Sequence, residues 1–544
     1  MPLLSRILLS LPLTVLQAPV LAGDLPEIQK NAVESNRSDA AHWGPDASKY
    51  VSWSTHTNRL IPVYTFGTKG AGDGIDLTSY TGENSAYRDE SRVRNIYGFV
   101  PTRTVAPDAE YMDQTDVFRI QKAALESGKK RVILVVFDGN DWVSTRAAAI
   151  WKSGKVGYDS GRGTGLHMQD YDAHGTSQFG FMVTSPHNEG TNVDVNRQTV
   201  SNPGGKIRGG YDPARGGLTP WEPTDDQLYP MAKTEGQGDV HAYTDSASSA
   251  TSMTAGIKTY NDSINVDPTG TPVVTAAHLA QQKGMAVGVV TSVTISHATP
   301  AAAYAHNVHR DDYQDLARDL LGLPSVAHPQ PLPGVDVLLG GGAGMEKEKD
   351  GGQGKNFVPG NPYLPEEELK AIDIENGGKY LVAQREAGVD GGERLRQAAK
   401  EAASTGKRLF GFYGAEGGNL PFQGSHGDYK PAPGWKTRDL SYTEADVIEN
   451  PTLAEMTTAA LTVLEKDPEG FWLMVEAGDV DWAKHDNNLD AAVGAVLSGD
   501  EAVKTLTDWV ERHRGWDETV MIVTADHGHY LVIDDPQMLV PENR

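Results

Sequence analysis

The sequence predicts an α/β fold, with a doubly wound, mainly parallel central sheet, helices on both faces and several loop insertions. Two observations support it. Short apolar, β-branched runs alternate with helical patterns along most of the chain, as in successive βαβ units. The run at 131–137, RVILVVF, is apolar almost throughout instead of alternating, which is typical of a parallel strand buried on both faces.

The elements follow one another in the order that this fold requires. After the strand at 131–137, a helix is expected over 141–155, with small and apolar residues available to pack on the sheet. We then expect helices over 273–283, 311–321, 391–404, 451–467 and 489–514, and strands over 286–291, 335–340, 408–413, 470–476 and 518–524.

The chain divides into three parts. Residues 1–22 read as a signal peptide, 23–128 as an N-terminal extension packed on the core, with short candidate strands at 51–54 and 60–66, and 129–544 as the catalytic domain. Insertions rich in Gly, Pro or charge are expected near 157–239, 341–365 and 414–449. The first of them is either a flap over the site or a plain surface excursion.

Residues 7–22 are predominantly apolar, follow Arg6 and end in small residues, which indicates a secretory signal peptide and a periplasmic or secreted protein. The alternative, a buried N-terminal helix, would have to accommodate Pro12 and Pro19. No later stretch reaches the roughly 20 apolar residues of a membrane span.

Charge and cysteine content exclude several function classes. The 48 Lys and Arg residues face 73 Asp and Glu residues, a formal charge of -25, which argues against a nucleic-acid-binding surface. The chain has no Cys, so disulfides and thiol chemistry are excluded. Any metal site must therefore use His, carboxylate and hydroxyl ligands.

The stretch 242–261, AYTDSASSATSMTAGIKTYN, is the first candidate for chemistry. A turn at Thr244 and Asp245 leads into a helix of small residues, which places Ser246 in the first turn. There the free backbone N–H groups and the helix dipole favour an anion such as phosphate. By itself, the same pattern is also typical of a simple N-cap at Asp245 or Ser246.

Four further segments join an apolar strand to carboxylates, histidines or an arginine: 131–142, 296–310, 471–488 and 518–530. All four would lie at the carboxyl ends of strands, where open α/β sheets place their ligand sites. Together with 242–261, and in this order, the segments resemble the alkaline phosphatase family from about residue 130 to 530.

The resemblance implies a role for each matching residue. Ser246 matches the nucleophile, Arg310 the phosphate-binding arginine, and Asp245 would orient Arg310. The ligand sets that it implies are Asp138, Asp526 and His527 for the zinc beside the nucleophile, Asp481 and His485 for the second zinc, and Asp138, Thr299 and Glu476 for a third, magnesium site. Ligand chemistry agrees, because oxygen donors suit Mg²⁺ and mixed imidazole and carboxylate sets suit Zn²⁺.

The chain departs from the family pattern at three points. His297 and Trp482 stand where some members have Asp and Lys. In addition, the family's second zinc takes another His well downstream of the segment around Asp526, and this sequence stops before such a residue. Either the C-terminal part is truncated or another residue substitutes; His306, His309 and His529 are expected to be supporting or structural residues, not ligands.

The function expected from this resemblance is hydrolysis of small phosphate monoesters through a phosphoserine, with two Zn²⁺ and one Mg²⁺, and it leaves room for a homodimer. Two alternatives stay open. One is a phosphodiesterase or sulfatase of the same superfamily, although the sequence around Ser246 lacks the arginine of the sulfatase formylglycine motif. The other is a weakly active or non-catalytic metal- or phosphate-binding remnant, because a zinc ligand is missing.

Overall fold

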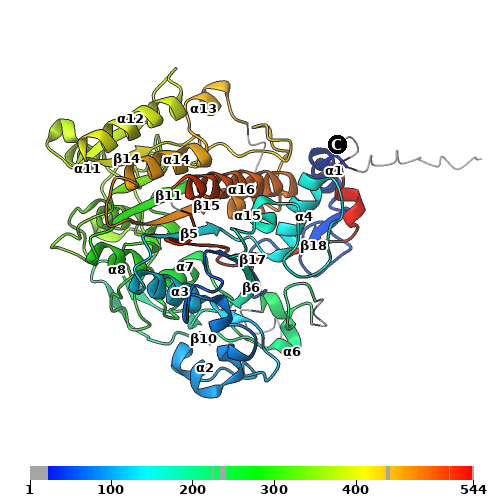
Figure 1. The fold of residues 1–544 in the computed structure, drawn as a ribbon. Coiled ribbons are helices and arrows are strands. Elements are labelled where there is room, and N and C mark those ends of the chain that lie inside the picture. The colour runs from blue at the N-terminus through cyan, green and yellow to red at the C-terminus, as the bar shows by residue number, and fades with distance from the viewer. Residues whose placement is uncertain are drawn as a thin grey trace, which may run out of the picture.

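The computed structural model describes residues 23–222, 224, 226–232, 240–436, 441–513 and 515–541. The expected signal peptide, 1–22, lies outside the described residues. A single ten-stranded sheet runs through the middle of the molecule, with helices above and below it (Figure 1). The α/β fold class is therefore confirmed.

Seven strands of this sheet are parallel, in the order β13-β14-β12-β11-β15-β5-β16. They are β5 (Arg131–Phe137), β11 (Ala286–Thr294), β12 (Val337–Gly341), β13 (Tyr380–Gln384), β14 (Arg408–Phe412), β15 (Phe471–Ala477) and β16 (Thr519–Thr524). Six of them were expected from the sequence, and β13 was not.

Three strands extend the sheet beyond β16: β3 (Ile61–Phe66), β6 (Gln178–Val183) and β4 (Met112–Asp113). β3 runs antiparallel to both β16 and β6. The segment 23–128, expected to pack on the core as an extension, thus supplies two strands of the central sheet. Its other candidate strand, 51–54, makes only an isolated bridge from Val51 to Trp43.

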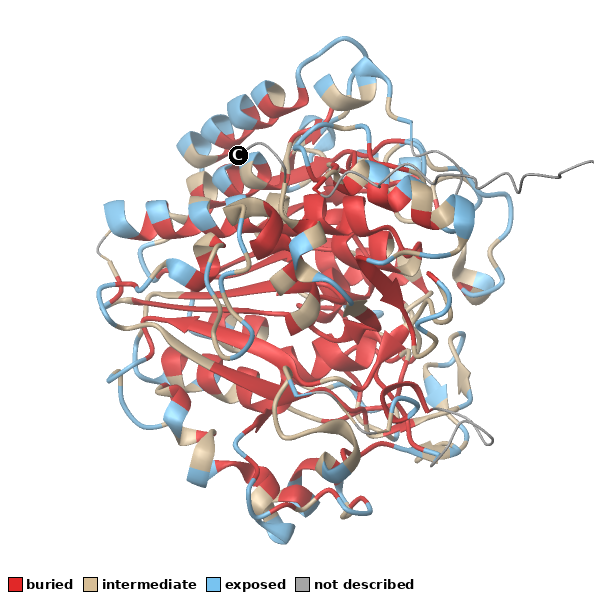
Figure 2. Ribbon diagram, turned by 90° about the vertical axis from the view of Figure 1, so that its right-hand side faces the viewer, coloured by how far each residue is buried: buried red, intermediate tan, exposed pale blue. Residues whose placement is uncertain are grey.

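Alternation along β5 explains the two helical layers. Ile133, Val135 and Phe137 belong to the core on one side of the sheet, together with residues of α4, α12, α14 and α16. The intervening residues Val132 and Leu134 belong to the core on the other side, with residues of α3, α7, α8 and α9. Figure 2 shows this buried centre between exposed outer helices.

The helices, in chain order, are α1 (Leu25–Ser35), α2 (Glu90–Tyr97), α3 (Gln114–Glu126), α4 (Trp142–Ser153), α5 (His167–Asp170), α6 (Pro213–Gly216), α7 (Ser246–Ala255), α8 (Ala276–Gln282), α9 (Ala298–Ala302), α10 (Tyr313–Leu321), α11 (Glu366–Ile372), α12 (Gly391–Thr405), α13 (Glu444–Ile448), α14 (Leu453–Leu464), α15 (Asp479–His485) and α16 (Leu489–Arg512). Short 3-10 helices are η1 (Leu77–Ser79), η2 (Gly82–Asn84), η3 (Ala86–Arg88), η4 (Tyr229–Met231), η5 (Gly354–Asn356), η6 (Ile374–Asn376) and η7 (Pro536–Leu539). None of the helices in the described part of the chain combines the length and apolar character that a bilayer crossing requires.

Four pairs of short strands lie outside the main sheet. They are β1 (Ala41–Trp43) with β18 (Leu531–Ile533), β2 (His56–Thr57) with β17 (Gly528–His529), β7 (Asn188–Glu189) with β10 (Ile207–Arg208), and β8 (Val193–Asp194) with β9 (Thr199–Val200). The first two pairs join the N-terminal segment to the end of the chain. In particular, the pairing of β2 with β17 sets His56 directly opposite His529.

Candidate active site

The expected site residues converge beyond the carboxyl ends of the parallel strands. Asp138 directly follows β5, and Thr299 lies in α9, shortly after β11. Glu476 is the last residue but one of β15, and Asp526 is the second residue after β16. Each of these four side chains is buried, with a relative exposure of 0%. Parallel strands bring their ends to one edge of a sheet, so residues far apart in sequence meet there.

Ser246 is the first residue of α7, and the N-cap of this helix is Asp245. The Ser246 hydroxyl lies 3.1 Å from Nε2 of His527 and 3.4 Å from Oδ1 of Asp138. It therefore faces the carboxylate and imidazole cluster from the positive end of a helix. This geometry suits a hydroxyl that must react with an anionic substrate.

Asp245 caps α7 by accepting a hydrogen bond from the Ser248 N–H at 3.0 Å, and it also accepts one from Nη1 of Arg310 at 3.0 Å. Burial alone would raise the pKa of Asp245, but the charge of Arg310 and the hydrogen bonds from Ser248 lower it to about 2. Asp245 is thus ionised and fixes one edge of the guanidinium. Arg310 lines the same pocket as Ser246, so its donors are available to an anion there.

Asp138, Asp526 and His527 form the first cation position, since one ligand atom of each lies within 4.8 Å of the others. Oδ2 of Asp138, Oδ2 of Asp526 and Nδ1 of His527 are buried without a hydrogen-bond partner among the described residues. Burial, together with the charge of Asp526, raises the pKa of Asp138 well above its usual range. Two carboxylates and an imidazole packed in this way suit a cation, and the donor set fits zinc.

Glu476 and Thr299 are the residues expected at a third position, and a ligand atom of Glu476 lies within 4.8 Å of one of Asp138. Burial and the charge of Asp526 raise the pKa of Glu476 to about 8. Oε1 of Glu476 and Oγ1 of Thr299 have no hydrogen-bond partner in the part of the chain that the structure describes. His297 borders this position, because one of its nitrogens lies within 4.8 Å of ligand atoms of Asp138 and Glu476.

His297 also contacts Arg310, with 3.3 Å between its Nε2 and Nη2 of the arginine. Burial and the charge of Arg310 lower the pKa of His297 to about 3, so the ring is neutral. Trp482 stacks edge-on against this ring at a centroid distance of 5.7 Å. The two residues that depart from the family pattern are therefore in contact with each other at the wall of the pocket.

Asp481 and His485 lie side by side on α15, as their spacing predicts, with 3.5 Å between Oδ2 and Nε2. His56, which the sequence reasoning missed, completes the group. Its Nε2 lies 3.0 Å from Nε2 of His485 and 3.6 Å from Oδ1 of Asp481.

The tautomers of His56 and His485 follow from the hydrogen bonds that their Nδ1 atoms make. Nδ1 of His56 lies 3.1 Å from the carbonyl oxygen of Thr244, and Nδ1 of His485 lies 3.1 Å from that of Ser54. A carbonyl can only accept, so both Nδ1 atoms carry protons. Burial lowers the pKa of each histidine, so in the neutral form both Nε2 atoms present lone pairs to each other. Two imidazole nitrogens and a carboxylate at these distances form a set of donor atoms that suits a shared cation.

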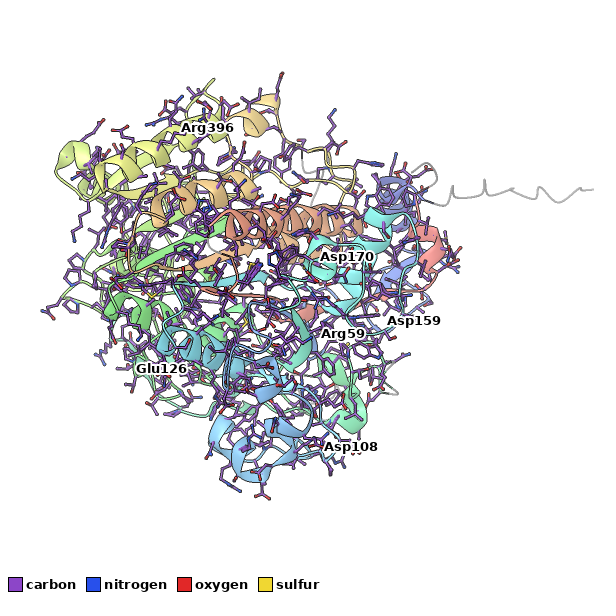
Figure 3. All side chains as sticks on the ribbon, viewed as in Figure 1. Arg59, Asp108, Glu126, Asp159, Asp170 and Arg396 are labelled. Carbon is purple, nitrogen blue, oxygen red and sulfur yellow. The ribbon has the colours of Figure 1, made fainter. Side chains whose placement is uncertain are left out.

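His529 lies beside this second position. Its Nε2 is 2.7 Å from Oδ1 of Asp481, and the ring is buried. One ligand atom of His529 lies within 4.8 Å of ligand atoms of His56, Asp481 and His527, so His529 stays a candidate ligand as well as a supporting residue. Arg59, labelled in Figure 3, donates to the carbonyls of His529 and Leu531 and to Asp141, which holds this turn against the start of α4.

Lys484 is a further residue that the sequence reasoning missed. It is fully buried, and its Nζ donates at 2.9 Å to the carbonyl of Gly139 and to Oδ1 of Asn140. Burial lowers its pKa to about 8. The side chain ties α15 to the turn after β5, and so holds the second cation position against the first.

A pocket of about 550 Å³ gives access to these groups. Ser246, Arg310, Asp481 and His485 lie in its wall. Residues of the segment 414–449 also line it, namely Glu416, Gly417, Asn419, Phe422 and Lys436. Part of the insertion expected there thus borders the site.

A family model described as "Alkaline phosphatase" matches residues 214–538, more than half of the chain. The chain is 31% identical over 285 residues to alkaline phosphatase 3 of Bacillus subtilis, covering 52% of this chain and 49% of that protein. It is 31% identical over 337 residues to an Escherichia coli (strain K12) alkaline phosphatase, covering 58% and 63%.

The chain therefore spans about half the length of the Bacillus relative and under two thirds of the E. coli one. Among solved structures, it resembles a Thermus thermophilus alkaline phosphatase with 23% identity and a TM-score of 0.45, over 74% of this chain and 60% of that chain.

Proposed function

Because the chain belongs to the alkaline phosphatase family, we propose that it hydrolyses phosphate monoesters through a phosphoseryl intermediate on Ser246. One observation supports this most directly. The Ser246 hydroxyl, at the start of α7, contacts Asp138 and His527, and Ser246 lines the same pocket as Arg310. A nucleophile, a place for cations and an anion-binding group meet at one point.

Three cation positions belong to this proposal. Asp138, Asp526 and His527 would hold a zinc ion beside Ser246, and Asp481, His485 and His56 would hold a second. Asp138, Glu476 and Thr299 would hold a magnesium ion, with His297 alongside. Bound there, such ions neutralise the phosphate oxygens and lower the pKa of hydroxyl groups.

Each residue of the site then has its own role in the reaction. Arg310, fixed by Asp245, holds two phosphate oxygens and orients the phosphorus toward Ser246. Oγ of Ser246 forms a bond to phosphorus as the bond to the alcohol oxygen breaks; the hydroxyl proton is released and the alcohol takes one up from solvent. Water then attacks the phosphoserine from the vacated side, and Ser246 regains its proton as phosphate leaves.

His56 is our candidate for the third protein ligand of the second zinc. That ligand was sought downstream of Asp526, whereas His56 lies 429 residues before His485 in the chain and beside it in space. Three protein ligands and one open position are the usual arrangement of a catalytic zinc site. We therefore propose a catalytic metal centre in place of a remnant.

The test is turnover by the purified chain, supplied with Zn²⁺ and Mg²⁺, of p-nitrophenyl phosphate, bis(p-nitrophenyl) phosphate and p-nitrophenyl sulfate. We expect the monoester to be the preferred substrate and Ser246→Ala to abolish its turnover. Preference for the diester or the sulfate would select the superfamily alternatives, and turnover by Ser246→Ala at the wild-type rate would refute the nucleophile.

Export and a homodimer stay predictions. The apolar stretch at 7–22 is the reason to expect a periplasmic or secreted protein, and N-terminal sequencing of the protein isolated from cells would test cleavage after residue 22.

A further inference from the structure

We propose that this chain binds an additional transition-metal ion, of the zinc class, between His306, Asp319 and His328. One ligand atom of each residue lies within 4.8 Å of the others. None of the three lines the pocket of Ser246. The inference does not depend on the proposed function, because it concerns residues that the phosphatase reaction does not use.

The three residues come from neighbouring segments around α10. His306 lies in the loop after α9, Asp319 is within α10, and His328 is in the loop between α10 and β12. His306 and Asp319 are buried, with exposures of 6% and 0%, while the His328 side chain retains 18%. The cluster is thus closed toward the core and open on one side to solvent.

His306 is held in the tautomer that binds metals. Its Nε2 lies 2.8 Å from the carbonyl oxygen of Val273, which can only accept, so Nε2 carries the proton. Burial lowers the pKa of His306, so the ring is neutral and Nδ1 presents a lone pair. Nδ1 finds no hydrogen-bond donor among the described residues, although it is buried. A histidine whose other nitrogen donates to a backbone carbonyl is the usual form of a metal ligand.

Asp319 supplies a fixed buried carboxylate. Its Oδ2 accepts from the backbone N–H of His306 at 3.1 Å, and its Oδ1 accepts from the Ser325 hydroxyl at 2.7 Å. Nδ1 of His328 lies 2.9 Å from Oδ2 and 3.1 Å from Oδ1.

An ion pair between protonated His328 and Asp319 is the simplest alternative, and it accounts for these two residues. It leaves the lone pair of His306 without a partner in a buried position, which is unfavourable for a polar group. A metal ion satisfies all three side chains at once, and this is the reason to prefer it.

Ligand chemistry selects the class of metal. Two imidazoles and one carboxylate suit Zn²⁺ or a similar transition metal, whereas Mg²⁺ and Ca²⁺ prefer oxygen donors. Ligands of a tetrahedral zinc lie about 3.3 Å apart, so atoms already within 4.8 Å need only small side-chain rotations. A water molecule on the open side of His328 would complete four-coordination.

The surroundings keep His306 in place. The ring of His278, on α8, stacks on it at a centroid distance of 5.2 Å and an interplanar angle of 1°. Arg310 lies in the same loop, four residues after His306, and its backbone N–H donates to the carbonyl of Asp262 at 2.6 Å. A metal ion at His306 would therefore fasten α10 to the loop that leads to the phosphate-binding arginine.

The experiment uses the full chain, stripped with chelator and reloaded with Zn²⁺ alone, then dialysed and analysed for metal per chain. The variant is His328→Ala, since this side chain is partly exposed. The matched control is His309→Ala, a histidine of the same loop as His306 that lies outside the cluster. We expect His328→Ala to hold one zinc equivalent fewer than the wild type and His309→Ala to hold the same number. Turnover of p-nitrophenyl phosphate should be unchanged in both.

Equal zinc content in folded His328→Ala and the wild type would overturn the proposal and leave the ion pair as the explanation. If His328→Ala does not fold, anomalous scattering at the zinc edge from wild-type crystals grown with Zn²⁺ decides instead. A peak between His306, Asp319 and His328 supports the site, and its absence, with peaks present at the Ser246 pocket, overturns it.

Discussion

Replacing His56 by Ala removes one of three side chains around the second cation position. The two Nε2 atoms lie 3.0 Å apart, that of His485 lies 3.5 Å from Oδ2 of Asp481 and that of His56 lies 3.6 Å from Oδ1, near the spacing of about 3.3 Å between ligands of a tetrahedral zinc. His56 can therefore bind with almost no movement. Loss of a mere supporting residue weakens a metal site about 10–100-fold, so loss of a ligand should weaken this one by more than about 100-fold, or about 2.7 kcal/mol.

The assay is zinc content after dialysis, together with turnover of p-nitrophenyl phosphate. We expect His56→Ala to lose one zinc per chain and to turn over at least about 100-fold more slowly, because a bound metal contributes several kcal/mol to the transition state. Added imidazole should restore part of the activity. His56→Phe, which keeps a ring stacked on His527, should not recover it.

His174→Ala is the control for a histidine substitution far from the site, since that side chain is 73% exposed. Full zinc content and activity in folded His56→Ala would refute the reasoning, and would mean that His56 only packs on His527.

The other predictions concern phosphate binding by Arg310, the metal preference of the third site and the effect of removing the metal ions. Arg310→Ala should weaken inhibition by inorganic phosphate about 10- to 100-fold. Arg310→Lys should restore only part of this inhibition, because a point charge cannot replace a guanidinium that makes two parallel hydrogen bonds. Unchanged inhibition constants would contradict the assignment. His297→Asp should raise the affinity of the third site for Mg²⁺ relative to Zn²⁺, since it replaces a nitrogen by an oxygen donor; equal Mg²⁺ titrations of the two proteins would count against it. Chelator should abolish turnover and lower the unfolding temperature, because Asp138 and Asp526 then face each other without a cation, and both should return with Zn²⁺; a chelated protein with full activity would exclude the metal centre.

The sequence predicted the parallel part of the fold well because each buried strand is a continuous apolar run. It also predicted where the chemistry lies, since carboxylates and histidines follow those runs directly, as at Asp138 and Asp526. β13 was missed because YLVAQ is short and ends in a polar residue, Gln384, at the edge of the sheet, where one side has no neighbouring strand.

His56 could not be found by the same rule, because it precedes an apolar strand, β3, instead of following one. β3 is antiparallel to β16, so its beginning lies at the edge of the sheet where the parallel strands end. A histidine just before an antiparallel strand is therefore as well placed as one just after a parallel strand. Only the pairing of β3 with β16 could reveal this, and the pattern of the sequence does not contain it. Lys484 was missed for a different reason, since an exposed lysine on a short helix is the common case and its burial depends on the packing of α15.

The central claim is that Ser246 is the nucleophile of a phosphate monoesterase, and trapping the phosphoenzyme tests it most directly. The metal-loaded chain is mixed with a ³²P-labelled phosphate monoester, quenched in acid at a moderately low pH where phosphoserine survives, and digested for peptide mapping. We predict close to one acid-stable label per chain on the peptide that contains Ser246, and none in Ser246→Ala. Turnover by the wild-type chain with label on another residue, or with the same label in Ser246→Ala, would contradict it.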